Sequence, residues 1–248
     1  MINITRGERP ISLDNPEIKQ YLEDVIAYKA LTEAERKIIK KPEVGTYRTE
    51  NLLEAFDRDF YAKCYLTEQK FENSWAMDIE HFRSKAFGQY PELRYEWTNL
   101  YPCSHDANMM KSNTEPLGGY LDPCDAADDV EKEIVYTWGL GGKFDFDSLN
   151  PQNPKALNTA KLLDKVHNGT DKNSTQKTAT LRKFIADKVQ TVTELIMEWL
   201  AAGKDGNKEE EVKTSRKLKN ILSRKSDYTM LLRSQPSVKK YVPKDFLD

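Results

Sequence analysis

The chain of 248 residues is nearly balanced in charge, with 38 Lys and Arg residues against 40 Asp and Glu residues. This balance excludes an overall basic field, so any contact with nucleic acid must come from a local patch. No stretch reaches the roughly 20 apolar residues of a membrane helix, and residues 1–21 lack the apolar segment of a signal peptide. Three cysteines without close pairing predict reduced thiols. We therefore expect a cytoplasmic protein that does not contact membranes.

Residues 15–63 carry the periodicity of helices. The segment "NPEIKQYLEDVIAYKAL" begins with an Asn-Pro start signal, and "LTEAERKIIKK" contains a Thr-x-x-Glu variant of a helix cap. The segment "TENLLEAFDRDFYAKC" has apolar residues at helical spacing. We predict an N-terminal helical scaffold over residues 1–63.

The helical periodicity ends after residue 63. The aromatic-rich runs "WAMDIEHF" and "YEWTNLYPCS" predict two strands separated by a loop with Gly88 and Pro91, and "HDANMMKSN" predicts a short helix. A turn-rich extension follows, in which "WGLGGKF" reads as a hairpin turn. Residues 151–248 are mostly helical, with polar hinges at "NGTDKNST" and "AAGKDGNKEEE". The expected architecture is mainly α with a small β-containing core (α+β), in three domains over residues 1–63, 64–150 and 151–248.

A spaced motif follows the acid-histidine pair "EH" of "DIEHFRSK". Its pattern is W-x-N-L-x(7)-N-x-x-K, and its residues are Trp97, Asn99, Leu100, Asn108 and Lys111. With "MINITRGERPISL", "YLDPCD", "LLDKVHNG" and "LRKFI", the chain resembles the HNH nucleases that are paired with an ATPase in retron and Septu anti-phage systems, the PtuB-like family. The resemblance touches most of the chain, but only residues 78–111 are specific to chemistry. It implies a ββα-metal (HNH) core within residues 64–150.

Phosphodiester hydrolysis requires an activated water and neutralisation of the charge that develops on the phosphate. His81 is the candidate general base, because an imidazole with an ordinary pKa of about 6.5 is largely neutral at cellular pH. Glu80 and Asn108 are the expected oxygen ligands of one divalent ion, Mg²⁺ or Mn²⁺. Adjacent strand residues point to opposite faces, so Glu80 and His81 can act together only if the strand ends there.

The remaining site residues are expected to orient the base or to bind substrate. By resemblance, Asn99 is the second catalytic residue, whose amide hydrogen-bonds the backbone of the loop that carries His81. The expected nucleic-acid contacts are Lys111, Arg83 and Lys85 near the motif, and Arg216, Lys217 and Lys219 in the basic helix "KTSRKLKNILSRK". Four alternatives remain open: Asn99 caps a turn, Lys111 is solvated, Arg83 pairs with Glu80, and the basic helix is a solvated face.

The chain departs from many HNH proteins of this kind, which bind a structural zinc through two Cys-x-x-Cys pairs. Those four positions fall on Cys64, Thr67, Ser104 and Ala107, and a single thiolate cannot hold a tetrahedral zinc. We expect no structural zinc, with apolar packing of Trp75, Trp97 and their neighbours in its place. Away from the motif, His167 is expected at a helix end, where Gly169 closes the turn and a cationic side chain is favoured.

The motif and its spacing predict a metal-dependent endonuclease. By resemblance it is the effector of an anti-phage system, with nucleic acid as substrate, DNA favoured over RNA, and with a separate PtuA-like ATPase as partner. The alternative is a catalytically silent subunit that keeps the HNH scaffold and docks on a partner protein. The presence of Glu80, His81, Asn99 and Asn108 favours the enzyme.

Overall fold

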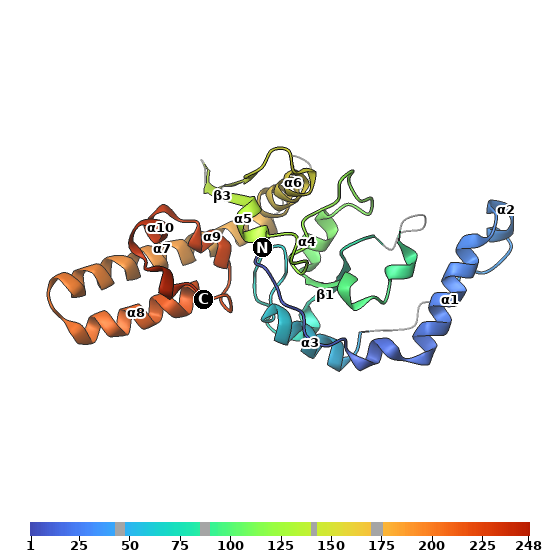
Figure 1. Cartoon of the computed structure of the whole chain (residues 1–248), viewed down its shortest axis with the longest axis horizontal. Helices are drawn as coiled ribbons and strands as arrows, with labels where there is room; N and C mark the ends of the chain where they lie inside the picture. Colours follow the sequence, from blue (N-terminus) through green and yellow to red (C-terminus); the bar gives the residue numbers. More distant parts are fainter. Residues whose placement is uncertain (43–47, 85–89, 140–142, 170–175) are drawn as a thin grey trace. The chain divides into compact units, whose positions relative to one another are not determined.

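The computed structural model describes residues 1–42, 48–84, 90–139, 143–169 and 176–248 (Figure 1). Helices dominate, and the strands form two antiparallel sheets of two strands each. The prediction of a mainly α, α+β protein is confirmed. Lys85 and most of the predicted hinge "NGTDKNST" lie outside the described residues. No helix in the described part of the chain combines the length and apolar character needed to cross a bilayer.

The chain divides into two compact units. The motif unit comprises Ile4–Cys64 and Phe71–Leu117, and the helical unit comprises Met1–Asn3, Tyr65–Lys70 and Gly118–Asp248. This division differs from the three predicted domains. The predicted N-terminal scaffold and the strand-containing segment share one core, because α3 contacts β2, whereas the turn-rich extension packs with the C-terminal helices, because β4 contacts α6.

The motif unit begins with helices and ends with the predicted strand-loop-strand-helix order. Its elements are η1 (Ile11–Asp14), α1 (Pro16–Ala30), α2 (Glu33–Arg36), α3 (Glu50–Phe60), η2 (Ser74–Ala76), β1 (Asp78–His81), η3 (Pro91–Leu93), η4 (Trp97–Asn99), β2 (Leu100–Cys103) and α4 (His105–Met110). Both predicted caps are present: Asn15 accepts a hydrogen bond from the Glu17 N–H, and Thr32 forms a capping box with Glu35.

Strands β1 and β2 pair antiparallel, with Asp78 opposite Cys103 and His81 opposite Leu100. Helix α3 covers this pair through aromatic contacts. The ring of Phe60 lies 5.6 Å from that of Tyr101, and the ring of Phe56 lies 5.3 Å from that of Trp97. These contacts hold β2 and the turn of η4 before it against α3.

Arg6 ties the N-terminal segment to the same core. Its guanidinium lies over the rings of Trp97 and Tyr101, at 4.6 and 4.3 Å from their centroids, and donates a hydrogen bond of 2.9 Å to the Leu100 carbonyl. A cation in an aromatic surround is stabilised by the ring quadrupoles. Arg6 therefore fixes the entry to β2, the strand that pairs with the histidine-bearing strand.

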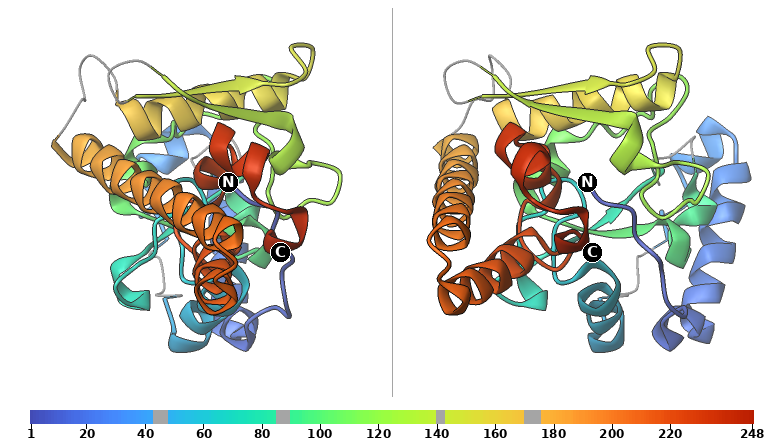
Figure 2. Two further views of the ribbon diagram at one scale, coloured as in Figure 1. Left: turned by 90° about the vertical axis from the view of Figure 1, so that its left-hand side faces the viewer. Right: turned by 60° about the vertical axis from the view of Figure 1, so that its left-hand side comes forward.

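The helical unit is built on long helices and one hairpin. Its elements are α5 (Val130–Glu133), β3 (Ile134–Trp138), β4 (Phe144–Ser148), α6 (Pro154–Asn168), α7 (Gln176–Lys204), α8 (Lys208–Leu222), α9 (Thr229–Arg233), α10 (Pro236–Tyr241) and η6 (Lys244–Phe246). Strands β3 and β4 pair antiparallel and lie along α6. Residues 140–142 of the predicted hairpin turn "WGLGGKF" lie outside the described residues. Helices α7 and α8 pack side by side across the second predicted hinge (Figure 2).

His167 lies near the end of α6, as predicted, but it is not the favoured cation that we expected there. Its side chain is buried, its Nδ1–H donates to the Leu163 carbonyl at 2.8 Å, and its ring lies 4.8 Å from that of Phe146. Burial among these groups lowers the pKa of His167 to about 4, so the imidazole is neutral. Gly169 closes the turn as predicted, with a φ of 78° and its N–H on the Lys165 carbonyl.

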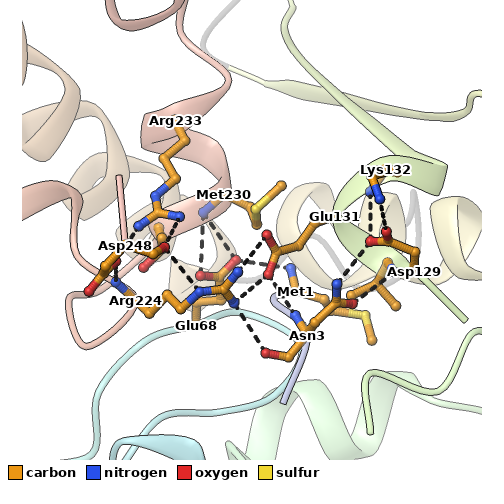
Figure 3. A network of polar contacts seen from close by, with 12 residues as sticks. Met1, Asn3, Glu68, Asp129, Glu131, Lys132, Arg224, Met230, Arg233 and Asp248 are labelled. Carbon is orange, nitrogen blue, oxygen red and sulfur yellow. Dashed lines mark hydrogen bonds and ion pairs between the residues drawn. The ribbon is translucent and has the colours of Figure 1, made fainter. Parts of the chain in front are cut away.

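A polar network joins distant segments of the helical unit (Figure 3). The ammonium of Met1 donates to the Glu68 carboxylate at 2.9 Å and to the Tyr136 hydroxyl at 2.7 Å, all within the interior. Glu68 also accepts from the Met230 N–H on α9. Because a buried charge is stable only when it is paired, this ion pair specifies how residues 1–3 and 65–70 pack with the hairpin and α9.

Candidate active site

Four of the predicted motif residues, Glu80, His81, Asn108 and Lys111, line a small depression of about 200 Å³ in the motif unit. Its walls come from the end of β1 and from the segment around the C-terminal end of α4. The lining residues are Ile79, Glu80, His81, Ser84, Asn108, Lys111, Ser112 and Asn113. Strand β1 ends at His81, so Glu80 and His81 can both line the depression although they are adjacent in sequence.

His81 is held in one tautomer. Its Nε2 lies 2.9 Å from the Arg94 carbonyl, and the side chain is almost fully buried. A carbonyl only accepts hydrogen bonds, so Nε2 carries the proton and the neutral ring has its basic lone pair on Nδ1. The Arg94 carbonyl therefore sets both the orientation of the ring and the nitrogen that can act as a base.

Asn99 fastens the loop that follows His81. Its Oδ1 accepts from the Arg83 N–H at 2.7 Å, and its Nδ2 donates to the carbonyls of Arg83 and Leu93 at 3.0 and 3.1 Å. Its own carbonyl accepts from the Phe82 N–H at 2.9 Å. These are backbone contacts of the kind that the resemblance implied, and they span both ends of the loop that carries Arg83 and Arg94. The part played by Asn99 in catalysis stays a prediction.

The structure places Lys111 differently from its predicted role as a substrate contact. Its Nζ donates to Glu80 Oε1 at 2.6 Å and to the carbonyls of His81 and Phe82 at 3.0 and 2.5 Å. The Lys111 side chain is only 5% exposed, and three protein oxygens stabilise its buried ammonium. Lys111 therefore binds the strand end that carries the acid-histidine pair. It is also the ion-pair partner of Glu80, the role that the sequence had left open for Arg83.

An acidic residue outside the sequence motif contacts one of the residues that line the depression. Asp78 Oδ2 accepts from Asn108 Nδ2 at 3.0 Å and lies 3.0 Å from His105 Nδ1. The sequence contained a signal for Asp78, since residues two apart on a strand share a face and Asp78 stands two before Glu80. Through Asp78, the amide of Asn108 is oriented with its nitrogen toward β1.

The donors at the depression suit a hard divalent cation. Glu80 and Asn108 supply a carboxylate and an amide oxygen from two different elements, and Mg²⁺ or Mn²⁺ takes such ligands together with waters. Within the described residues, no group of three or more His, Cys, Asp or Glu side chains is placed to hold a metal. The ammonium of Lys111 competes for Glu80, but it would keep its two carbonyl acceptors if the carboxylate turned to a cation.

The other predicted nucleic-acid contacts lie on two separate units. Arg83 is exposed beside the site, with its guanidinium 5.3 Å from the Tyr90 ring centroid. Lys85 lies outside the described residues. Arg216 and Lys217 are exposed on α8 of the helical unit, and Lys219 lies 3.5 Å from Asp245 and over the Phe246 ring. Of the predicted nucleic-acid contacts that the structure describes, only Arg83 and Lys111 therefore lie near the motif.

Two cysteines meet where the sequence suggested a lost metal site. The sulfurs of Cys64 and Cys103 lie 4.0 Å apart, and both side chains are buried. Burial raises the pKa of the Cys103 thiol well above its ordinary value, and the neighbouring Cys64 raises it further. Trp97 packs in this core as expected, but the prediction for Trp75 is wrong, because its side chain is 63% exposed.

Comparison of the chain with protein-family models, with curated proteins and with solved structures found no match. The functional assignment therefore depends on the residues and their geometry.

Proposed function

We propose that the protein is a metal-dependent endonuclease and that the depression at the end of β1 is its active site. The observation that supports this most is that His81 is oriented to act as a base. Its ring is oriented by the Arg94 carbonyl, its loop is fastened by Asn99, and it lines one depression with Glu80 and Asn108. Phosphodiester hydrolysis needs a general base and a bound divalent ion, and an oriented imidazole beside two hard oxygen donors can provide both.

In this proposal each residue has a separate task. His81 takes a proton from the attacking water at Nδ1, while Nε2 stays bonded to the Arg94 carbonyl and keeps the ring aligned. Glu80 and Asn108 would hold the divalent ion, which supplies charge neutralisation at the phosphate. Arg83, exposed next to the fastened loop, contacts a neighbouring phosphate of the substrate.

The substrate and partner are proposed on the same basis. A site of this kind binds the phosphate of one strand, so we propose nucleic acid as the substrate, with DNA favoured over RNA. The resemblance to the PtuB-like family supports a separate ATPase as the working partner in anti-phage defence.

A specific observation favours the alternative of a silent binding subunit. The Glu80–Lys111 ion pair is buried and closely bonded, which is what a site kept only for its fold would contain. The two functions differ in one respect that can be measured. Only the nuclease needs a proton acceptor at His81.

The decisive experiment compares wild-type protein with His81→Ala on supercoiled plasmid, linear phage DNA and total tRNA. Reactions contain Mg²⁺ or Mn²⁺, with and without the ATPase, and EDTA in a parallel set. We expect cleavage that EDTA abolishes and that His81→Ala slows by about 10²- to 10⁴-fold. His167→Gln is the matched control, because His167 belongs to the helical unit and does not line the depression. Equal cleavage by wild-type and His81→Ala proteins would exclude this active site.

A further inference from the structure

In the helical unit, the carboxylate of Asp248 is bound by several hydrogen-bond donors of the same chain. The Asp248 side chain accepts from the Arg224 N–H at 2.7 Å, from the Ser223 hydroxyl at 2.7 Å and from Arg233 Nη2 at 2.5 Å. Its main-chain oxygen accepts from Arg224 Nε and from Arg233 Nη1 at 3.1 and 3.0 Å. Five donors thus converge on three oxygens of one residue (Figure 3).

This donor arrangement matches a phosphate group. A phosphomonoester presents three terminal oxygens, and two guanidinium groups with a hydroxyl and a backbone N–H are typical ligands for it. Burial acts to raise the pKa of the Asp248 carboxyl, but the hydrogen bonds from Arg224, Ser223 and Arg233 outweigh it and lower the pKa below its ordinary value. Ser223, Arg224 and Arg233, which we call the cradle, therefore favour an anion.

Access to the cradle is open on the solvent side. The Asp248 side chain is 53% exposed, so it can leave without unpacking a core. On departure of Asp248, the guanidinium of Arg233 loses the carboxylate that pairs with it, and an exogenous anion would restore the pairing.

A cavity of about 910 Å³ adjoins the cradle within the helical unit. Arg224 and Arg233 belong to both the cavity lining and the cradle. Lys239 and Lys244 also line it, and within the described residues neither makes an ion pair. Cavities that bind small molecules measure about 300–1,000 Å³, so the volume is sufficient for an organic ligand rather than a lone ion.

The rest of the lining limits the class of ligand. Val135, Met230 and Leu247 provide an apolar surface, which suits a flat base. Two carboxylates also line the cavity: Glu131 pairs with the Nη1 and Nη2 atoms of Arg224, and Asp129 pairs with Lys132. A carboxylate has further lone pairs, so both can still accept hydrogen bonds from hydroxyl or amino groups of a ligand. One phosphate, a sugar with hydroxyl groups and a base meet all three requirements.

We propose that this cavity binds the phosphomonoester of a nucleotide, with the phosphate replacing Asp248 in the cradle of Ser223, Arg224 and Arg233. The ligand is either a free mononucleotide or the 5′-phosphorylated end of an oligonucleotide, which share this chemistry. This site is independent of the proposed nuclease site, and its occupation does not require that the protein cut nucleic acid.

Calorimetric titration of the full chain at constant ionic strength tests the proposal. The ligands are AMP, adenosine, inorganic phosphate, and one short oligonucleotide with a 5′-phosphate or a 5′-hydroxyl. We expect AMP to bind more tightly than adenosine or inorganic phosphate. A preference for the 5′-phosphorylated over the 5′-hydroxyl oligonucleotide identifies a nucleic-acid end as the source, and binding of AMP alone identifies a free nucleotide.

Variants separate the cradle from general electrostatics. Asp248→Ala removes the competing carboxylate and keeps only the main-chain oxygen, so AMP affinity should rise by about tenfold. Asp248→Asn provides a second variant that removes the charge and keeps the size of the side chain. The double substitution Lys239→Gln with Lys244→Gln should weaken binding by about tenfold. Lys240→Gln is the matched control, because Lys240 is on the same helix but does not line the cavity. The proposal is overturned if AMP fails to bind Asp248→Ala and Asp248→Asn at millimolar concentration, if adenosine binds as well as AMP, or if Lys240→Gln matches the double variant.

Discussion

The ammonium of Lys111 lies 2.6 Å from the carboxylate of Glu80, across 31 residues of sequence, and both side chains are nearly excluded from solvent. Removing two charges from water is costly, and each charge tolerates burial because the other is present. The carbonyls of His81 and Phe82 complete the surroundings of the ammonium. This ion pair links the segment after α4 to the end of β1, where the proposed base is carried.

Breaking this ion pair should destabilise the protein. Glu80→Gln leaves a buried ammonium without a counter-charge, and we expect the free energy of unfolding in urea to fall by about 3 kcal/mol. The double variant Glu80→Gln with Lys111→Met should recover part of the loss, since no lone charge remains. Lys183→Met, which breaks an exposed ion pair with Asp187, is the control and should cause no measurable change. Equal effects of Glu80→Gln and Lys183→Met would contradict the prediction.

The same ion pair should oppose metal binding. A cation at Glu80 must compete with the ammonium, so Lys111→Met should bind Mn²⁺ more tightly than wild type, by about tenfold. Asn108→Ala removes a predicted ligand and should weaken Mn²⁺ binding by a similar factor. Isothermal titration with MnCl₂ measures both effects without reference to activity. Unchanged affinity in both variants would place the metal elsewhere.

Asn99 should affect stability as well as cleavage. Asn99→Ala leaves the Arg83 N–H and the carbonyls of Arg83 and Leu93 without their partner, which should lower the free energy of unfolding by about 2 kcal/mol. Because the loop then releases His81 from its alignment, cleavage should also fall. Asn220→Ala, at an exposed position on α8, is the control for thermal unfolding. A variant with wild-type melting temperature would show that the loop does not depend on this amide.

His167 should make stability depend on pH. Its pKa is about 4 in the folded protein against an ordinary value of 6.5, so the fold disfavours the protonated ring. Below pH 6.5 the unfolded chain takes up a proton that the folded protein does not, and stability falls until the pH reaches about 4. Between pH 7 and pH 5 the loss should be about 2 kcal/mol.

His167→Gln provides the comparison, because it can still donate to the Leu163 carbonyl but does not titrate. Urea unfolding at pH 7 and pH 5 should show a smaller pH dependence for this variant than for wild type. Identical pH dependence in the two proteins would remove His167 as the cause.

The three cysteines should differ in reactivity. Cys103 has a raised pKa because it is buried, so it is a neutral thiol at pH 7, and Cys64 is equally enclosed. Cys124 is only half-buried. Iodoacetamide should therefore modify Cys124 first in the folded protein, as read by peptide mass spectrometry, and Cys124→Ser should be modified only after denaturation. Early modification of Cys103 would contradict its burial.

Features that depend on neighbouring residues could be predicted from the sequence. The cap of α1 at Asn15, the capping box of Thr32 and Glu35, and the pairing of β3 with β4 each involve residues that are close in sequence. The order of strands and short helix around the motif was predictable for the same reason. The spacing of the motif also grouped Glu80, His81 and Asn108, which line one depression.

Features that depend on segments far apart in the chain were decided by the tertiary structure. Spacing placed Lys111 near the motif, but only packing shows that its ammonium is enclosed by Glu80 and two carbonyls. The exposure of Trp75 and the contact of Cys64 with Cys103 were likewise invisible to local patterns. The physical reason is common to all of them: the burial and the charge partner of a side chain are set by whichever distant segment packs against it, and periodicity describes only the segment to which that side chain belongs.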